Sequence, residues 1–287
     1  MPFRSIEVRP IAGALGAEVH GIDLARPIGN AATVELRQAF TDYLVLFFRD
    51  QQLTPEQHLA FSRLFGPLVR MPYVKHLDDY PDIIAVLKEA DERKISTFGN
   101  AWHSDFSFLE EPPMGSVLYG REVPAYGGDT VWSNMYDAYE ALSDGMKRML
   151  LGLKAMHAGR PYGRGGLPKD LKVSRSIKIQ RDIPEADKEI AQPVVRLHPE
   201  SGRKALFVNS IYTTRFEGMT EAESRPILDF LYQHCQTPEF TCRFRWAQGS
   251  LAIWDNRCTM HYAVNDYDGQ RRLMHRVTVA GEKPIAA

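Results

Sequence analysis

Strand-like segments crowd both ends of this 287-residue chain. Between Ser5 and Asp23, apolar and polar residues alternate with glycines interposed, which is typical of short twisted strands joined by turns. The last third carries more such segments: PVVRLHP, ALFVNSIY, FTCRFRW, SLAIWDN and RRLMHRVTVAG. Since helices are expected between and beside these strands, the pattern predicts a mainly β protein with flanking α, built on a β-sandwich or jelly-roll core.

Helices are predicted at four places. Apolar residues recur at helical spacing over residues 31–43 and again over residues 136–157. A further helix is expected to begin at Pro55, with Thr54 as its N-cap, and another covers TEAESRPILDFLYQHC. LVLFFR, DIIAVLK and SVLYGREVP are predicted to be strands in the first half of the chain.

The chain shows no boundary between domains. It contains no internal repeat, low-complexity tract or linker, so residues 1–287 are expected to form a single domain. Residues 160–192 are polar, basic and glycine-rich without clear periodicity. A loop of that length is usually a lid or a binding loop, so this segment is predicted to be an active-site lid or insertion.

Charge and cysteine content indicate the compartment and exclude some partners. The formal net charge is -1, so no field of one sign favours nucleic acid or an anionic membrane, and any bound anion must be held by local arginines. The three cysteines form no CxxC pair, which fits structural thiols in a reducing compartment. The start lacks a signal-peptide pattern, and the longest apolar stretch is too short to span a bilayer, so a soluble cytoplasmic protein is expected.

The most informative segment is NAWHSDFSF, in which one residue separates His103 from Asp105. On an extended strand, two side chains at this spacing point to the same face and can reach one metal. His261, in WDNRCTMHYAV, would complete a set of two histidines and one carboxylate. Such a set occupies one face of an octahedral iron and leaves positions open for a cosubstrate and O2.

A second HxD tripeptide tests how specific this pattern is. His76 and Asp78 lie in an acidic, turn-like stretch that ends at Pro81, so a surface loop is the better interpretation there. Aromatic and small residues surround His103 as they would in a shaped pocket. His103 is therefore the stronger candidate for a metal ligand.

Two arginines follow His261 on a predicted strand. Arg272 and Arg276 share one strand face with Met274, while His275 faces the other way. They stand roughly 13 Å apart along the strand, which is too far to clamp one carboxylate but suits two separate anions. Surface salt bridges are the alternative explanation for such a pair, and the neighbouring metal motif disfavours it.

Three segments of this chain resemble the taurine dioxygenase family of 2-oxoglutarate oxygenases. They are WHSDFSFLEEPPMGSVLYGREVPAYGGDTVW, HPESGRKALFVN and AIWDNRCTMHYAVNDYDGQRRLMHRVTVAGEKP, and the likeness spans nearly the whole chain. The resemblance implies a double-stranded β-helix (jelly-roll) core with His103, Asp105 and His261 as ligands of Fe(II). It also implies that Thr130, in GGDT, and Arg272 hold the carboxylate of the cosubstrate 2-oxoglutarate.

The resemblance further implies the residues that contact the substrate. Arg276 would meet its anionic end, and Tyr212 would be an aromatic residue of the pocket. Met71 and Val74 stand where taurine-specific members carry a histidine and a tyrosine. The expected substrate is therefore a small carboxylate, sulfonate or sulfate with an apolar body, such as an aryloxyalkanoate, rather than taurine.

The resemblance implies a dioxygenase that hydroxylates a C–H bond of this anion with O2, converts 2-oxoglutarate to succinate and CO2, and assembles as a dimer or tetramer. Two alternatives remain open at this point. A metal-dependent hydrolase could use the same ligands to activate water. A catalytically inactive binding protein could keep the metal on the same fold.

Overall fold

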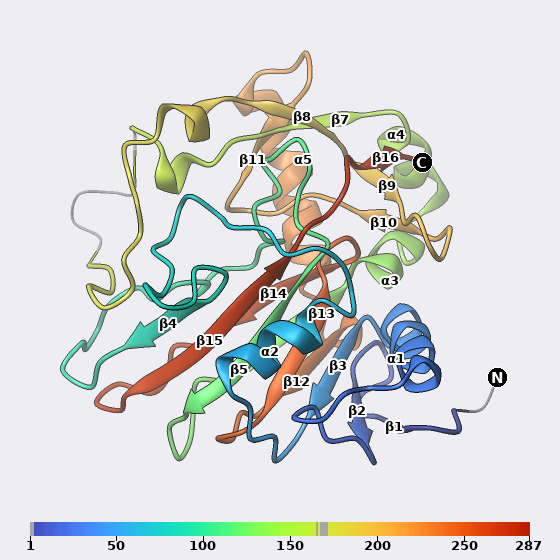
Figure 1. The fold of residues 1–287 in the computed structure, drawn as a ribbon. Coiled ribbons are helices and arrows are strands. Elements are labelled where there is room, and N and C mark those ends of the chain that lie inside the picture. The colour runs from blue at the N-terminus through green and yellow to red at the C-terminus, as the bar shows by residue number, and fades with distance from the viewer. Residues whose placement is uncertain (1–2, 165, 167–171) are drawn as a thin grey trace.

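The computed structural model describes residues 3–164, 166 and 172–287 and is dominated by a twisted seven-stranded sheet (Figure 1). Its order is β1-β2-β3-β13-β5-β15-β4, and its pairings are antiparallel apart from β2 with β3. The strands are β1 (Glu7–Pro10), β2 (Ala17–His20), β3 (Val45–Phe48), β4 (Ile84–Lys88), β5 (Gly115–Glu122), β13 (Leu251–Asp255) and β15 (Arg272–Val279). Strands from both ends of the sequence thus meet in one sheet, as the distribution of strand-like segments predicted.

A smaller sheet packs against this large one. Its order is β12-β6-β14, comprising β6 (Thr130–Asn134), β12 (Thr241–Phe244) and β14 (Thr259–Ala263). The Phe47 ring of β3 stacks on the Phe244 ring of β12 with 4.1 Å between centroids, and the Trp132 and Trp254 rings lie 5.9 Å apart. Two antiparallel layers with a shared apolar interior form the predicted jelly-roll core.

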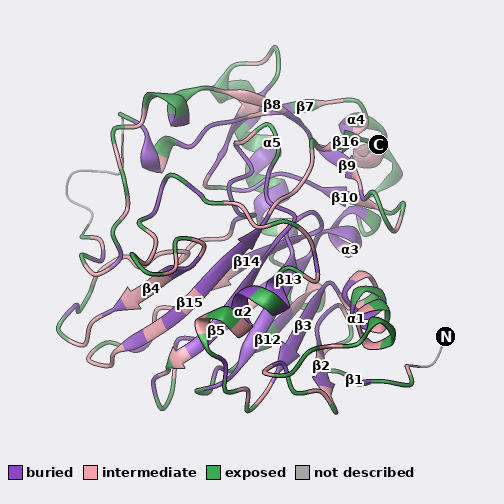
Figure 2. Ribbon diagram, in the orientation of Figure 1, coloured by how far each residue is buried: buried purple, intermediate pink, exposed green. Residues whose placement is uncertain are grey.

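Helices cover the opposite face of the large sheet, where α1 (Asn30–Tyr43) and α2 (Pro55–Ser62) lie in front of the strands (Figure 1). Their inward residues, such as Phe40 and Phe61, pack with Val117 and Ile253 of the sheet. The predicted start of α2 is confirmed, because Thr54 and Gln57 form a capping box. Figure 2 shows the same layers, because the strands of the large sheet are largely buried behind α1 and α2, whose outer faces are exposed.

Two further three-stranded sheets complete the fold at the other end of the molecule. One is β10-β9-β16, formed by β9 (Val195–Leu197), β10 (Lys204–Leu206) and β16 (Ile285–Ala286). The other is β11-β7-β8, formed by β7 (Lys154–His157), β8 (Ile190–Pro193) and β11 (Thr213–Phe216), and α5 (Glu221–His234) contacts β11. Short 3-10 turns lie at Arg160–Tyr162, Pro184–Asp187 and Pro238–Phe240. No helix among the described residues is long and apolar enough to cross a membrane.

The prediction of one helix over residues 136–157 is wrong. The chain forms α3 (Met135–Glu140), α4 (Asp144–Leu150) and then the strand β7. The Ser143 hydroxyl accepts a hydrogen bond from the Met146 amide and starts a new helix, and Gly152, with φ of 82°, ends it. The segment after Gly152 pairs with two strands, so pairing overrides its helical spacing.

The strand predicted over ALFVNSIY is also shorter than expected. It ends with β10 at Leu206, and Asn209 then forms a turn in which its Oδ1 accepts hydrogen bonds from the amides of Ile211 and Tyr212. The predicted lid at 160–192 falls partly on residues 165 and 167–171, which lie outside the described residues. The structure describes the remainder of that segment.

Candidate metal centre

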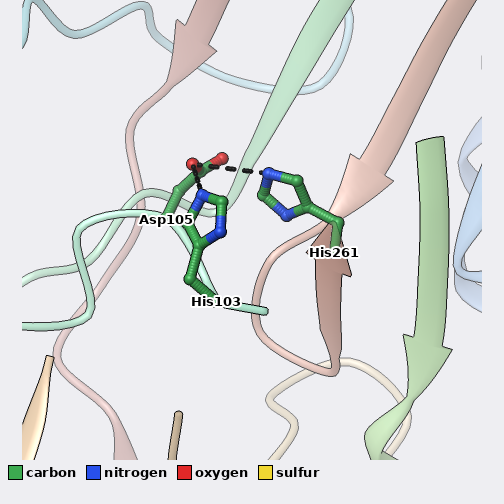
Figure 3. A group of neighbouring side chains, drawn as sticks. All are labelled: His103, Asp105 and His261. Carbon is green, nitrogen blue, oxygen red and sulfur yellow. Dashed lines mark ion pairs between the residues drawn. The ribbon is translucent and has the colours of Figure 1, made fainter. Parts of the chain in front are cut away.

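Three predicted ligands lie together in the interior (Figure 3). One carboxylate oxygen, Asp105 Oδ1, lies 3.5 Å from His103 Nε2 and 3.8 Å from His261 Nε2. Neighbouring ligand atoms around an octahedral ion stand about 3 Å apart, so a small contraction would complete the coordination. The donor set, two neutral imidazoles and one carboxylate, suits Fe(II) with open positions.

The backbone brings the two histidines together. His103 and His261 form an isolated antiparallel bridge in which each amide donates to the other's carbonyl, at 3.1 and 2.8 Å. Asp105 does not continue an extended strand, as the spacing argument assumed, but lies in a turn. Phe106, which follows it, has φ of 46° and is not a glycine, so strained backbone adjoins the carboxylate.

Hydrogen bonds orient the ligand atoms. His103 Nδ1 donates to the Ala101 carbonyl at 2.7 Å, so in the neutral ring Nε2 is the nitrogen with a free lone pair for a metal. Arg276 Nη2 lies 2.7 Å from Asp105 Oδ2, and the Ser116 hydroxyl donates to the same oxygen at 3.1 Å. Oδ1 of Asp105 is therefore the oxygen that faces the histidines.

Burial and charge set the protonation of the ligands. Burial alone would raise the pKa of Asp105, but Arg276 and the two histidines hold it well below its usual range. Burial, with His103 beside it, lowers the pKa of His261 well below its ordinary value. These residues are thus in their metal-binding forms at neutral pH, an ionised carboxylate and a neutral imidazole.

Asn256 is a supporting residue that the sequence analysis did not identify. Its Oδ1 accepts from the Asp105 amide at 2.6 Å, and its Nδ2 donates to the Asp105 carbonyl at 2.8 Å and to the Pro113 carbonyl at 3.1 Å. The side chain therefore fixes the backbone of the ligand from both sides. Its position directly after the buried strand SLAIWD was the only signal in the sequence.

Arg272 is a buried cation with no counter-ion in the part of the chain that the structure describes. It is 5% exposed, and no described carboxylate lies within 4.0 Å of its guanidinium. The nearest aromatic rings, Trp246 and Tyr267, are 5.9 Å from its central carbon. Burial lowers its pKa, yet an arginine stays charged in proteins, so this site calls for an anion.

The surroundings of Arg272 form a small inner chamber. This cavity of about 40 Å³ is lined by Thr130, Arg272 and Arg276 together with both histidine ligands. Gly128 of the GGDT motif has φ of 69°, and a Cβ there would lie 3.2 Å from Cδ and Nε of Arg272. The Thr130 hydroxyl accepts from Trp246 Nε1 at 3.0 Å, so its own proton is free to donate.

A larger cavity of about 330 Å³, the main cavity, adjoins the chamber, because His103, Phe98 and Gly99 line both. Tyr212 lines this main cavity and is buried, which raises the pKa of its phenol well above the ordinary value. Met71 and Val74 do not line it. They are buried behind it in an apolar cluster that includes Tyr212.

One wall of the main cavity comes from the described part of the predicted lid, at residues 173–181. Glu92 anchors this wall, because its buried carboxylate accepts from the Ser174 hydroxyl at 3.0 Å and from the amides of Arg175 and Ser176 at 2.5 and 3.1 Å. Farther along, Ile179 forms an antiparallel bridge with Val74.

A second cluster of potential ligands does not resemble a metal site. His198 Nε2 donates to Asp255 Oδ2 at 3.0 Å, and Arg257 binds both oxygens of the same carboxylate. Burial raises the pKa of the neighbouring Cys258 thiol well above its ordinary value. Asp255 is therefore already neutralised and hydrogen-bonded, which fits a structural ion-pair network.

The chain is similar to known proteins of one family over nearly its whole length. The family model described as taurine catabolism dioxygenase TauD, TfdA family matches residues 7–278. An alpha-ketoglutarate-dependent (2-oxoglutarate-dependent) sulfate ester dioxygenase of Pseudomonas putida is 36% identical over 98% of this chain and 91% of its own length. An alpha-ketoglutarate-dependent 2,4-dichlorophenoxyacetate dioxygenase of Cupriavidus pinatubonensis is 33% identical over 98% of this chain and 100% of its own. The crystal structure of a taurine dioxygenase from Burkholderia xenovorans matches with a TM-score of 0.81 at 34% identity, covering 99% of this chain and 93% of that one.

Proposed function

Since the chain belongs to the TauD/TfdA family and is an Fe(II)- and 2-oxoglutarate-dependent dioxygenase, we propose that its iron is held by His103, Asp105 and His261. The proposal is supported by the approach of both Nε2 atoms to one carboxylate oxygen. Iron held there would use 2-oxoglutarate and O2 to oxidise a C–H bond of the substrate, and the cosubstrate would be converted to succinate and CO2.

Thr130 and Arg272 would hold the far carboxylate of 2-oxoglutarate. The observation that carries this assignment is the buried Arg272, which has no carboxylate partner among the described residues and lines a chamber together with the two histidines. A carboxylate would supply the missing counter-ion, and the Thr130 hydroxyl has a proton to donate to it. A hydrolytic metal site has no need for such a cation.

The primary substrate would be a small anion with an apolar body, of the alkyl sulfate, alkylsulfonate or aryloxyalkanoate type. Relatives act on a sulfate ester and on 2,4-dichlorophenoxyacetate, and most residues lining the main cavity are apolar or small. Tyr212 would contact this body from the cavity wall, with Met71 and Val74 packed behind it. Arg276 would contact the substrate through Nε, which has no hydrogen-bond partner among the described residues.

The remaining groups of the chain position these reactants. Arg276 and Ser116 hold Oδ2 of Asp105, which directs Oδ1 toward the metal. The apolar walls of the main cavity and the predicted lid over residues 160–192 would exclude water around the reacting C–H bond. Deleting the lid should then raise the fraction of 2-oxoglutarate consumed without substrate oxidation, and unchanged coupling would contradict this role.

We also propose that the protein is a cytoplasmic homo-oligomer, a dimer or a tetramer. Its three cysteines are free and buried, which fits a reducing compartment. The oligomeric state rests on the family resemblance. Light scattering and cell fractionation test these two statements.

The decisive experiment is anaerobic addition of Fe(II) and 2-oxoglutarate to the metal-free protein. A weak visible charge-transfer band from the chelate is expected, and it should be lost in Arg272→Ala at the same 2-oxoglutarate concentration. Arg271→Ala is the matched control, because the neighbouring Arg271 is partly exposed and paired with Glu89 and Glu122 on the surface. A folded, metal-loaded protein without the band would indicate a hydrolase or an inactive binding protein instead.

A further inference from the structure

A buried histidine outside the metal centre joins two segments of the site. His157 is the last residue of β7, and its side chain is 0% exposed. Its Nδ1 lies 3.0 Å from the Ser107 hydroxyl, and its Nε2 lies 3.2 Å from the Thr213 hydroxyl. Burial lowers its pKa to about 3, so the ring is neutral at pH 7, with one nitrogen as donor and the other as acceptor. A hydroxyl can take either role, so both ring nitrogens are satisfied.

Ser107 belongs to the turn that carries the metal carboxylate, because it follows Asp105 by two residues. Its hydroxyl accepts a hydrogen bond from Asn209 Nδ2 at 2.9 Å, and its carbonyl accepts one from Gln192 Nε2 at 3.2 Å. Gln192 is a buried residue of β8. The turn of Asp105 is therefore tied by side chains to β7, to β8 and to the turn at Asn209.

Thr213 directly follows Tyr212, which lines the main cavity. The Thr213 hydroxyl accepts from the Asn209 amide at 3.0 Å, and Asn209 Oδ1 accepts from the Tyr212 amide at 3.0 Å. Next to the histidine, the Ala158 amide donates to the Tyr212 carbonyl at 2.8 Å. The side chain of His157 and the backbone beside it thus both hold the segment that carries Tyr212.

The same network lies at the base of the predicted lid over residues 160–192. β7 precedes this segment and β8 closes it, and the two strands pair so that His157 stands opposite Ile190. His157 and Gln192, one on each strand, both contact Ser107. The turn of the metal carboxylate and both ends of the lid therefore share one set of buried hydrogen bonds.

We propose that His157 is a positioning residue that fixes the metal carboxylate relative to Tyr212 and thereby couples the consumption of 2-oxoglutarate to oxidation of the substrate. This inference rests on the proposed function. His157 lines neither the main cavity nor the inner chamber, so it acts through Ser107 and Thr213. A displacement of about 1 Å between the metal and the substrate wall can cost about 100-fold in rate, which makes such a tie consequential.

His58 offers a matched control for a buried histidine. It is 1% exposed, and burial lowers its pKa as it does that of His157. Its ring nitrogens have no hydrogen-bond partner among the described residues, and it lies in α2, which covers the outer face of the large sheet (Figure 1). His58→Leu therefore removes a buried imidazole without removing a hydrogen bond near the metal centre.

The test measures coupling in His157→Leu, His157→Gln and His58→Leu, with hexyl sulfate and phenoxyacetate as probes. Coupling is the ratio of succinate formed to sulfate or phenol released, which does not depend on the fraction of folded protein. His157→Leu should raise this ratio about 2-fold or more and the KM for the probe about 10-fold, because two buried hydrogen bonds are lost. Its charge-transfer band with Fe(II) and 2-oxoglutarate should remain. His157→Gln should stay close to the wild type, because an amide can donate and accept, and His58→Leu should equal the wild type.

An unchanged ratio in His157→Leu overturns the proposal, as does an equal increase in His157→Gln or His58→Leu. If His157→Leu does not fold, Thr213→Val carries the same test, because it removes the hydroxyl that His157 contacts and keeps a branched side chain. A wild-type protein that shows no charge-transfer band, or that oxidises neither probe, contradicts the proposed function and the inference with it. A normal band in the wild type with an unchanged ratio in His157→Leu overturns the inference alone.

Discussion

Replacing each of the two buried arginines of β15 by methionine should change stability in opposite directions. Arg272 and Arg276 lie on one face of the strand and are 5% and 3% exposed, yet among the described residues only Arg276 has a carboxylate partner. Methionine keeps a similar length and removes the charge. In the metal-free protein, Arg272→Met should therefore raise the free energy of unfolding, whereas Arg276→Met should lower it.

The magnitudes follow from the partners of each side chain. Arg272→Met removes an unpaired buried charge and loses two aromatic contacts of about 0.5–1 kcal/mol each, so a net gain of about 1–3 kcal/mol is expected. Arg276→Met leaves Asp105 buried without its partner, which costs about 3–5 kcal/mol. For 2-oxoglutarate, loss of Arg272 should cost about 2–5 kcal/mol, or about 30-fold to 4,000-fold in Kd.

The assay is urea unfolding of each variant in the presence of a chelator, followed by titration of 2-oxoglutarate into the anaerobic Fe(II) form. The reasoning is refuted if Arg272→Met destabilises the metal-free protein as much as Arg276→Met does, because the guanidinium would then have an internal partner. Unchanged 2-oxoglutarate affinity in Arg272→Met would refute its assignment to the cosubstrate.

Three further predictions concern groups around the site and in the core. Glu92→Gln should raise the KM for substrate about 10-fold or more with a smaller change in kcat, because it weakens three hydrogen bonds to the cavity wall. The control Asp91→Asn should leave the KM unchanged. Equal KM values for Glu92→Gln and the wild type in a steady-state assay would contradict this. Burial lowers the pKa of His58 to about 3, so the unfolded chain binds more protons below pH 6.5 and stability falls as the pH decreases from 6.5 toward 3. The free energy of unfolding, measured at pH 7.5 and at pH 5, should fall by about 2 kcal/mol less in His58→Leu than in the wild type. An equal fall in both proteins would contradict this prediction. Asn256→Ala should lower the affinity for Fe(II) about 10-fold to 100-fold, because it removes the hydrogen bonds that hold the Asp105 backbone. Metal titration measures this affinity, and a value equal to that of the wild type would show that Asn256 does not position Asp105.

Features that depend on neighbouring residues were predictable from the sequence. The capping boxes at Thr54 and Thr220 start helices where local pattern placed them, because the N-cap and its partner lie three residues apart. The alternation of β15 placed Arg272 and Arg276 on one face in the same way. The helix predicted over residues 136–157 was wrong, because strand pairing with residues far along the chain decided the state of its last four residues.

The sequence by itself determined the HxD spacing, the strand-rich ends and the arginine pair, since each depends on covalent order and side-chain periodicity. Only the tertiary structure decided which charges are compensated. Asp105 and Ser116 reach Arg276 from 171 and 160 residues away, because the jelly roll folds both beside β15. Arg272, on the same strand face, has no carboxylate within 4.0 Å among the described residues. Hydrogen bonds and ion pairs act over a few ångströms of space whatever the separation along the chain, so the fold, and not the sequence pattern, determines which cations remain to bind anions.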